Sequence, residues 1–186
     1  MRFDKLLILD LDETLIFGTD IPLTWLPDFM VLGKFYIYKR PGLDSFLSAV
    51  AERFQLAVWT SATADYAHEV IARILPPTVK LEFAFCRENC TRRLHSEYNE
   101  THYVKNLNKL RKKGYRLEKV LVIDDSAEAY ALNYGNVIPV TKYRGEQNDD
   151  ELLMLLKFLE QIGSVEDVRK VEKRYWRQGT FEAAND

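Results

Sequence analysis

The chain has 186 residues, of which 47% are hydrophobic and 29% charged, a composition typical of one globular domain with a single core. Its formal net charge of −2 argues against a surface built as a whole for nucleic acid, although it leaves room for a local basic groove. No apolar run approaches the roughly 20 residues of a membrane span, and the N-terminus lacks the core of a secretory signal. We therefore expect a cytoplasmic or nuclear protein without a membrane partner.

Short apolar segments recur along the chain. Such segments are typical of strands in a parallel sheet that is covered on both faces. They span residues 5–10, 54–60, 79–84, 119–124 and 135–140, of which the third and the last are the weaker ones.

The stretches between these segments repeat apolar residues at helical spacing. We expect helices over residues 43–53, 64–75, 104–113 and 149–162. Pro76 marks the end of the second helix and Gly114 the end of the third. Strands that alternate with helices predict an α/β fold with a parallel sheet and right-handed crossovers.

We expect one domain over residues 1–163, with a small β insert at about residues 16–40. The remaining residues, 164–186, are predicted to form a helical tail, because Ser164 and Asp167 match a capping-box pattern. One face of this helix would hold Val165, Val168, Val171 and Tyr175.

Polar side chains follow three of the predicted strands. Asp10, Asp12 and Thr14 come after the first strand, Thr60 and Ser61 after the second, and Asp124 and Asp125 after the fourth. Lys105 begins the helix predicted before that fourth strand. Each signal alone is common in helix caps and turns. Because ligands of α/β sheets bind at the carboxyl ends of the strands, all four together predict one site.

The residue types at this edge suit phosphoryl transfer. Carboxylates gathered in one place repel one another, and a divalent cation removes that repulsion. Oxygen ligands favour a hard ion such as Mg²⁺. An aspartate can act as a nucleophile that forms an acyl phosphate, and Lys105, Thr60 and the cation can offset the charge of the transferring group.

Residues 10–15, Thr60, Lys105 and the Asp124–Asp125 pair resemble the four motifs of the haloacid dehalogenase superfamily, in the family's order. Residues 39–47, 59–67, 86–90 and 103–107 are similar to further signatures of one branch. This branch is the RNA polymerase II C-terminal-domain and small-CTD-phosphatase type, also called NLI-interacting-factor-like. The likeness implies a Rossmann-like, three-layer, doubly wound sheet with a small β insert and no large cap domain.

The resemblance also implies catalytic roles. Asp10 would be the nucleophile, and Asp12 would protonate the leaving oxygen and later activate water. Thr60 and Lys105 would hold the phosphoryl oxygens. Thr14, Ser61 and Arg87 are expected to bind substrate, Arg87 because it matches an arginine that helps to bind phosphate or substrate in that branch.

The same resemblance implies a Mg²⁺ site. Its ligands would be Asp10, the backbone carbonyl of Asp12, and the Asp124–Asp125 pair. The family often has Asp-Asn where this chain has Asp124–Asp125. Which of these two carboxylates contacts the metal therefore stays open.

The spacing between the motifs bears on the substrate. Neither residues 16–40 nor residues 85–104 can hold a folded cap domain, since a domain below about 40 residues usually needs disulfides, bound metals or oligomerisation to fold. An open site can admit a macromolecule, although residues 85–104 could instead build a compact lid. We expect a Mg²⁺-dependent phosphomonoester hydrolase with an aspartyl-phosphate intermediate, acting on phosphoserine or phosphothreonine in a protein.

Two alternatives remain. The densest basic stretch, residues 105–119, is most often a solvated surface. It could otherwise bind an anionic partner, which would suit a phosphatase that acts on nucleic-acid ends or nucleotides. A phospho-binding module with weak activity is the other alternative, although both Asp10 and Lys105 are present.

Overall fold

A central sheet of five parallel strands, in the order β10-β9-β1-β5-β6, organises the computed structural model, which describes residues 2–95 and 100–179. The strands are β1 (Leu6–Leu9), β5 (Gln55–Trp59), β6 (Leu81–Phe85), β9 (Val120–Asp124) and β10 (Val137–Pro139). Every residue of β1 and β9 is buried, as the continuous apolar runs indicate. The parallel α/β sheet confirms the prediction.

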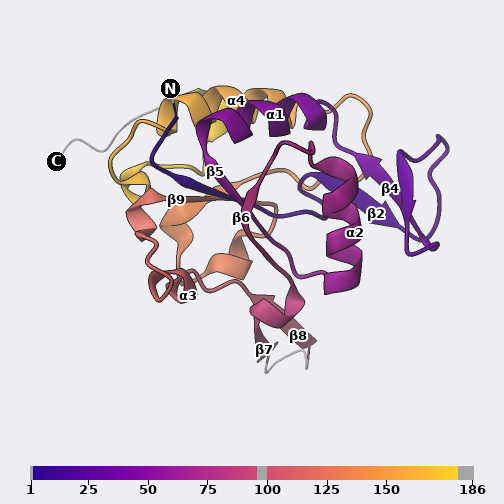
Figure 1. The fold of residues 1–186 in the computed structure, drawn as a ribbon, viewed down its shortest axis with the longest axis horizontal. Coiled ribbons are helices and arrows are strands. Elements are labelled where there is room, and N and C mark those ends of the chain that lie inside the picture. The colour runs from indigo at the N-terminus through magenta and orange to yellow at the C-terminus, as the bar shows by residue number, and fades with distance from the viewer. Residues whose placement is uncertain (1, 96–99, 180–186) are drawn as a thin grey trace.

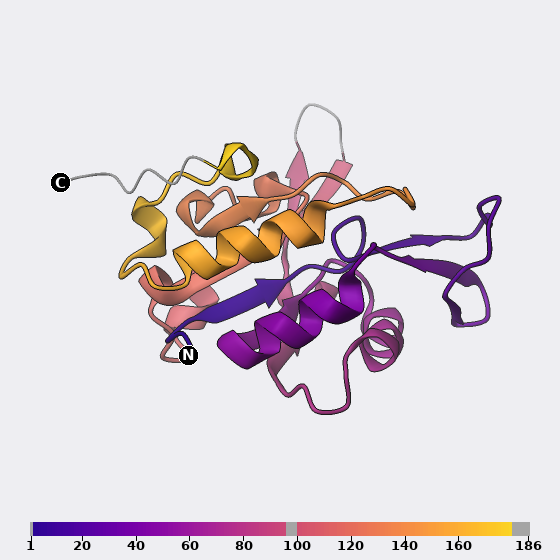
Figure 2. The same ribbon diagram turned by 90° about the horizontal axis from the view of Figure 1, so that it is seen from above.

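Helices cover both faces of this sheet (Figure 1). One face carries α1 (Leu43–Arg53), α2 (Ala64–Ile74) and α4 (Glu151–Ile162), whose buried side chains share a core with Leu7 and Leu9. Leu6 and Ile8 point to the other face and pack with residues of the short helix α3 (Asn108–Arg111) and nearby 3₁₀ turns. Figure 2 shows α1 and α4 side by side over the first face. The arrangement confirms the three-layer, doubly wound fold.

The segment after β1 forms the predicted small insert. Strands β2 (Ile16–Thr19), β3 (Phe29–Val31) and β4 (Phe35–Lys39) make an antiparallel sheet in the order β2-β4-β3. The insert projects beyond the carboxyl end of β1 (Figure 2). No helix in the described part of the chain combines the length and the apolar character needed to cross a membrane.

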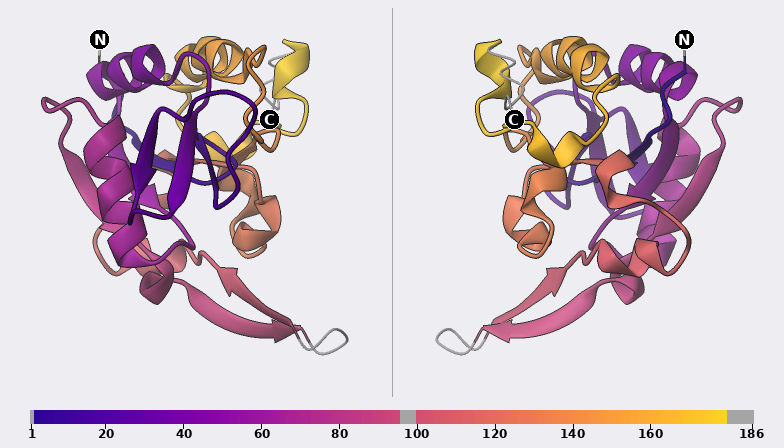
Figure 3. Two further views of the ribbon diagram at one scale, coloured as in Figure 1. Left: turned by 90° about the vertical axis from the view of Figure 1, so that its right-hand side faces the viewer. Right: turned by 90° about the vertical axis from the view of Figure 1, so that its left-hand side faces the viewer.

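The helix predicted over residues 104–113 is wrong in its first half. Val104 ends strand β8 (Glu100–Val104), which pairs with β7 (Thr91–His95) in an antiparallel hairpin. Helical structure begins only at Asn108. Aromatic and β-branched residues such as Tyr103 and Val104 favour a strand, and cross-strand pairing outweighs the apolar spacing here. The hairpin stands away from the body of the domain (Figure 3).

The predicted tail helix is also absent from residues 164–179. Two 3₁₀ turns, Val168–Lys170 and Trp176–Gln178, replace it. Valines at three of the four predicted face positions are stiff at χ1 and weak helix formers, while Val168 and Trp176 are buried in the core of the first face. Tyr175, expected on the same face as Val168, is 55% exposed, whereas Val168 is buried. Residues 180–186 of the predicted tail lie outside the described residues.

Candidate active site

The carboxyl ends of the central strands open into a cleft of about 320 Å³. Because Leu9 pairs with Ile123, the next residues, Asp10 and Asp124, emerge side by side from β1 and β9. Most of the predicted site residues line this cleft: Asp10, Asp12, Thr60, Ser61, Lys105, Asp124 and Asp125. The fold therefore brings together residues that are up to 115 positions apart in the chain, from Asp10 to Asp125.

Lys105 lies at the centre of this group. Its Nζ donates to Asp10 Oδ1 at 2.6 Å and to Asp124 Oδ2 at 2.6 Å, and all three side chains are buried. Burial opposes a charged ammonium, but Asp10 and Asp124 hold the pKa of Lys105 well above its usual range. Lys105 is thus a fixed cation between two carboxylates.

Asp10, Asp124 and Asp125 form an acidic cluster in which one oxygen of each lies within 4.8 Å of the others. Burial and the neighbouring Asp10 raise the pKa of Asp124 to about 7 and also raise the pKa of Asp125. Ionisation of the whole cluster is therefore unfavourable without added positive charge. Three converging carboxylate oxygens suit a hard divalent cation, so the donor set fits Mg²⁺.

Thr14 fixes the position of Asp125. Its hydroxyl donates to Asp125 Oδ1 at 3.1 Å and accepts from the Asp125 backbone N–H at 3.1 Å. Thr14 is fully buried, so its hydroxyl meets Asp125 and not the cleft. The sequence predicted that Thr14 binds substrate. We expect it instead to orient Asp125.

The environment of Asp12 suits proton transfer. Burial raises the pKa of its carboxyl to about 6, an effect that the hydrogen bond from Tyr66 opposes and the charge of Asp10 reinforces. The Tyr66 hydroxyl donates to Asp12 Oδ1 at 2.6 Å. A carboxyl that titrates near neutral pH can both give and take a proton.

Tyr66 lies within the signature of residues 59–67 and at apolar helical spacing, but neither observation revealed its role in the site. Replacing it with phenylalanine keeps the ring but frees the Asp12 carboxyl from its hydrogen bond. We expect Tyr66→Phe to lower kcat about five- to tenfold with little change in KM, which corresponds to the loss of one hydrogen bond with a net contribution of about 1 kcal/mol. Steady-state kinetics on a phosphopeptide checks this, with Tyr134→Phe, an exposed tyrosine, as the control. An unchanged kcat would remove Tyr66 from the account.

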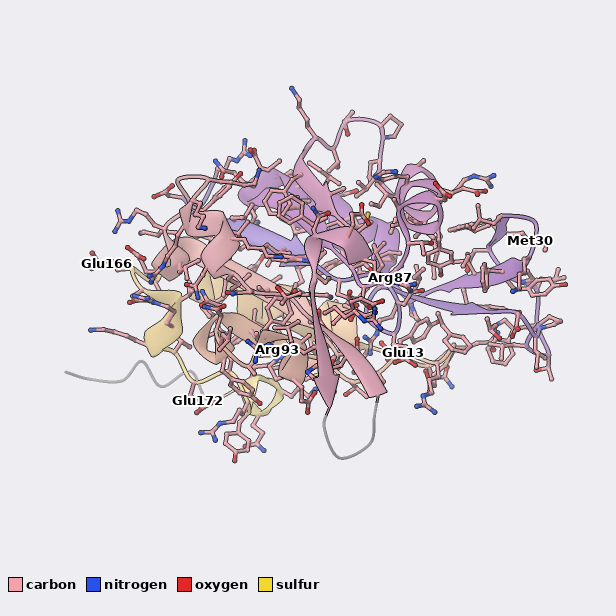
Figure 4. All side chains as sticks on the ribbon, turned by 90° about the horizontal axis from the view of Figure 1, so that it is seen from below. Glu13, Met30, Arg87, Arg93, Glu166 and Glu172 are labelled. Atoms are coloured by element: carbon pink, nitrogen blue, oxygen red, sulfur yellow. The ribbon has the colours of Figure 1, made fainter. Side chains whose placement is uncertain are left out.

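Thr60 and Ser61 follow β5, which flanks β1 on the side opposite to β9, and both line the cleft. The Thr60 side chain accepts from the Ala62 N–H at 3.1 Å, which orients its hydroxyl. Arg87 does not line the cleft, but its Nε donates to the Ser61 carbonyl at 2.8 Å and its guanidinium lies 5.3 Å from the Tyr103 ring centre. Glu13 and Arg87 are both labelled beside the hairpin in Figure 4, far from Met30 in the insert.

The cleft is also lined by residues that were not among the predicted site residues: Glu13, His102, Tyr103, Ser126, Glu128, Ala129 and Lys142. His102 and Tyr103 arrive through the hairpin that was mistaken for a helix. Lys142 comes from the loop after β10, where its Nζ lies 2.9 Å from Glu13 Oε2 and 3.4 Å from Asp125 Oδ2. A single lysine in a loop carries no sequence signal for such a position.

Comparisons with known proteins agree with this geometry. The sequence model of the family described as NLI interacting factor-like phosphatase matches residues 5–169. A probable C-terminal domain small phosphatase of Dictyostelium discoideum is 36% identical over 174 residues, which are 90% of this chain and 53% of that protein. The human carboxy-terminal domain RNA polymerase II polypeptide A small phosphatase 1 is 32% identical over 176 residues, or 90% of this chain and 63% of that protein.

The chain thus spans less than two thirds of the length of these curated relatives. Among solved structures, the fission yeast RNA polymerase II CTD phosphatase Fcp1 bound to beryllium fluoride superimposes with a TM-score of 0.65 at 20% identity, covering 88% of this chain and 63% of that one. At this identity the likeness shows a shared fold. On the extent of the family match and the identity to its members, the chain belongs to the NLI interacting factor-like phosphatase family.

Proposed function

We propose that this chain is a Mg²⁺-dependent phosphoric monoester hydrolase that moves a phosphoryl group from a phosphoprotein to Asp10 and then to water. One observation carries the proposal: Asp10 follows the central strand, pairs with Lys105 and shares an accessible cleft with Asp124 and Asp125. A nucleophile, a fixed cation and a set of metal ligands then meet at one point. The phosphatases among the relatives support the same reading.

In the first step, an Asp10 carboxylate oxygen attacks the phosphorus and the ester P–O bond breaks. The Asp12 carboxyl gives its proton to the leaving oxygen, which departs as a serine or threonine hydroxyl. Lys105 and the Thr60 hydroxyl would hold the phosphoryl oxygens. Mg²⁺ held by Asp10, the Asp12 carbonyl, Asp124 and Asp125 would offset the negative charge of the phosphoryl group.

In the second step, water attacks the phosphorus of the aspartyl phosphate. Asp12, now a carboxylate, takes a proton from that water, and the bond between phosphorus and the Asp10 oxygen breaks. Inorganic phosphate leaves and both carboxyl groups return to their starting forms. The pKa of about 6 at Asp12 suits both directions of this proton transfer.

The surroundings of the cleft favour a protein substrate. In the described residues the segments flanking it are the three-stranded insert and the two-stranded hairpin, and neither is a cap domain (Figure 3). An open cleft accepts a phosphorylated side chain that is attached to an extended segment. The human relative's name refers to the carboxy-terminal domain of RNA polymerase II. We infer a phosphoserine or phosphothreonine substrate, and with it a cytoplasmic or nuclear location.

The basic stretch gives the nucleic-acid alternative little support, because several of its cations have local partners. Lys109 Nζ donates to the Asn89 carbonyl at 2.7 Å, and Lys113 lies over the Phe85 ring. Arg116 pairs with Glu118 at 2.9 Å. These contacts are typical of a surface that stabilises its own fold.

The test is phosphate release from a panel of phosphoserine, phosphothreonine and phosphotyrosine peptides and a 5′-phosphorylated oligonucleotide, with Mg²⁺ and with EDTA. We expect Mg²⁺-dependent release from the phosphoserine or phosphothreonine peptides. Release from the oligonucleotide alone would favour the nucleic-acid alternative. Tight binding of phosphopeptides without any release would favour a phospho-binding module.

A further inference from the structure

Lys142 is held at the wall of the cleft by its chain neighbours. The Val140 N–H donates to the Asp124 carbonyl at 3.1 Å, and the Tyr143 N–H donates to the Glu13 carbonyl at 2.7 Å. The backbone on either side of Lys142 is therefore tied to the two segments that carry the acidic residues. This places the Lys142 side chain near these acidic residues.

The Lys142 ammonium has two carboxylate partners. Glu13 Oε2 is the closer at 2.9 Å, and Asp125 Oδ2 lies at 3.4 Å. Glu13 is outside the acidic cluster, whereas Asp125 is one of its three members. Lys142 thus supplies positive charge to the carboxylate of the cluster that Lys105 does not contact.

The two lysines differ in how firmly they are held. Lys105 is buried and makes two contacts of 2.6 Å, with Asp10 and Asp124. Moving its ammonium would leave buried carboxylates without their partner, which is energetically costly. The Lys142 side chain is 51% exposed. Water can solvate the released ammonium, and a divalent cation would compensate the Asp125 carboxylate, whose side chain is only 6% exposed.

We propose that Lys142 competes with a divalent cation for Asp125 and so sets the metal affinity of the acidic cluster. A cation bound to Asp125 brings like charge next to the ammonium, which repels it. Glu13, the closer partner, keeps the displaced ammonium in the cleft. Lys142 acts here as a positioning residue that tunes the metal site, and the inference rests on the proposed Mg²⁺-dependent function.

The experiment compares wild type with Lys142→Met, Lys142→Arg and Lys39→Met. Lys39 is a matched control. It also forms an ion pair, with an Nζ–Oδ1 distance of 2.7 Å to Asp44, but this pair does not line the cleft. The thermal unfolding midpoint is followed as MgCl₂ is added at constant ionic strength, because a ligand that binds only the folded state stabilises it by RT ln(1 + [L]/Kd), so that the dependence on MgCl₂ yields the Kd for Mg²⁺. This readout is independent of activity.

We expect Lys142→Met to lower the Kd for Mg²⁺ obtained from this dependence, on the order of three- to tenfold. Lys142→Arg and Lys39→Met should stay within about twofold of wild type, because both keep the positive charge near Asp125. A merely structural role would instead lower the unfolding midpoint of Lys142→Met in EDTA and leave its Mg²⁺ dependence unchanged.

An unchanged or higher Mg²⁺ requirement in Lys142→Met would overturn the role of Lys142. If Lys142→Met gives that result and wild type still hydrolyses phosphopeptides with Mg²⁺, only the inference about Lys142 fails and the proposed function stands. If Mg²⁺ neither stabilises wild type nor supports turnover, the proposed function fails and the inference falls with it.

Discussion

Asp10→Asn is expected to lose Mg²⁺-dependent phosphatase activity almost completely, with a fall in kcat of about a thousandfold or more. Asparagine keeps the shape of the side chain but replaces the charged nucleophilic oxygen with a neutral amide. The loss should not come from unfolding. Lys105 retains its 2.6 Å contact with Asp124, and one of three mutually repelling carboxylates is removed.

Hydrolysis of an aryl phosphate with and without Mg²⁺ measures this effect. Asp4→Asn, the same change at an exposed position, is the matched control and should behave as wild type. Thermal unfolding of both variants establishes that they are folded. Turnover by Asp10→Asn within about tenfold of wild type would contradict the assignment of Asp10 as the nucleophile.

Arg40→Met is expected to lower the free energy of unfolding by about 3 kcal/mol, the typical effect of removing one partner of a buried ion pair. The Arg40 side chain is 0% exposed. Its Nε and Nη2 donate to the two Asp149 carboxylate oxygens at 2.9 and 2.8 Å, and its Nη1 donates to the Thr14 carbonyl at 2.9 Å. Without Arg40, the Asp149 carboxylate and the Thr14 carbonyl are left with one partner fewer in a poorly solvated place.

This second change also reaches the active site, because Thr14 orients Asp125. We therefore expect Arg40→Met to raise the Mg²⁺ requirement as well as to destabilise the fold. Urea unfolding measures the stability. The control is Arg53→Met, which breaks the ion pair between Arg53 and Glu160. These two side chains are 39% and 46% exposed, so the control should lower the free energy of unfolding by less than about 1 kcal/mol. Equal effects of the two variants would show that the Arg40 pair is no more important than a surface pair.

Much of this fold could be predicted because its signals are local. Continuous apolar runs end on Asp10 and Asp124, and two such runs in a parallel sheet bring their following residues to one edge. Helix α1 was predicted with the bounds that the structure shows, since apolar spacing and the preceding Gly42 agree there. The order of the motifs then supplied the candidate site.

The rest depends on contacts between distant segments. The role of Tyr66 could not be predicted, because its hydrogen bond to Asp12 joins a helix to a loop 54 positions earlier. Lys142 reaches the cleft through backbone bonds of its neighbours to Glu13 and Asp124. The residues after Ser164 have helical spacing, yet they form 3₁₀ turns. There, Trp176 Nε1 donates to the Pro139 carbonyl at 2.7 Å, a contact with a distant segment. None of these partners is visible within a local window of sequence.

Transfer of the phosphoryl group to Asp10 can be observed directly with the Asp12→Asn variant. An aryl leaving group needs little help from an acid, so the first step should proceed, whereas the second step lacks the base that activates water. The variant is incubated with an aryl phosphate and Mg²⁺, quenched in acid, digested and analysed by mass spectrometry. We predict one added phosphoryl group on the peptide that contains Asp10, located on that residue. Finding no phosphoryl group on Asp10 under conditions in which wild type releases phosphate, or finding it on another residue, would contradict the account.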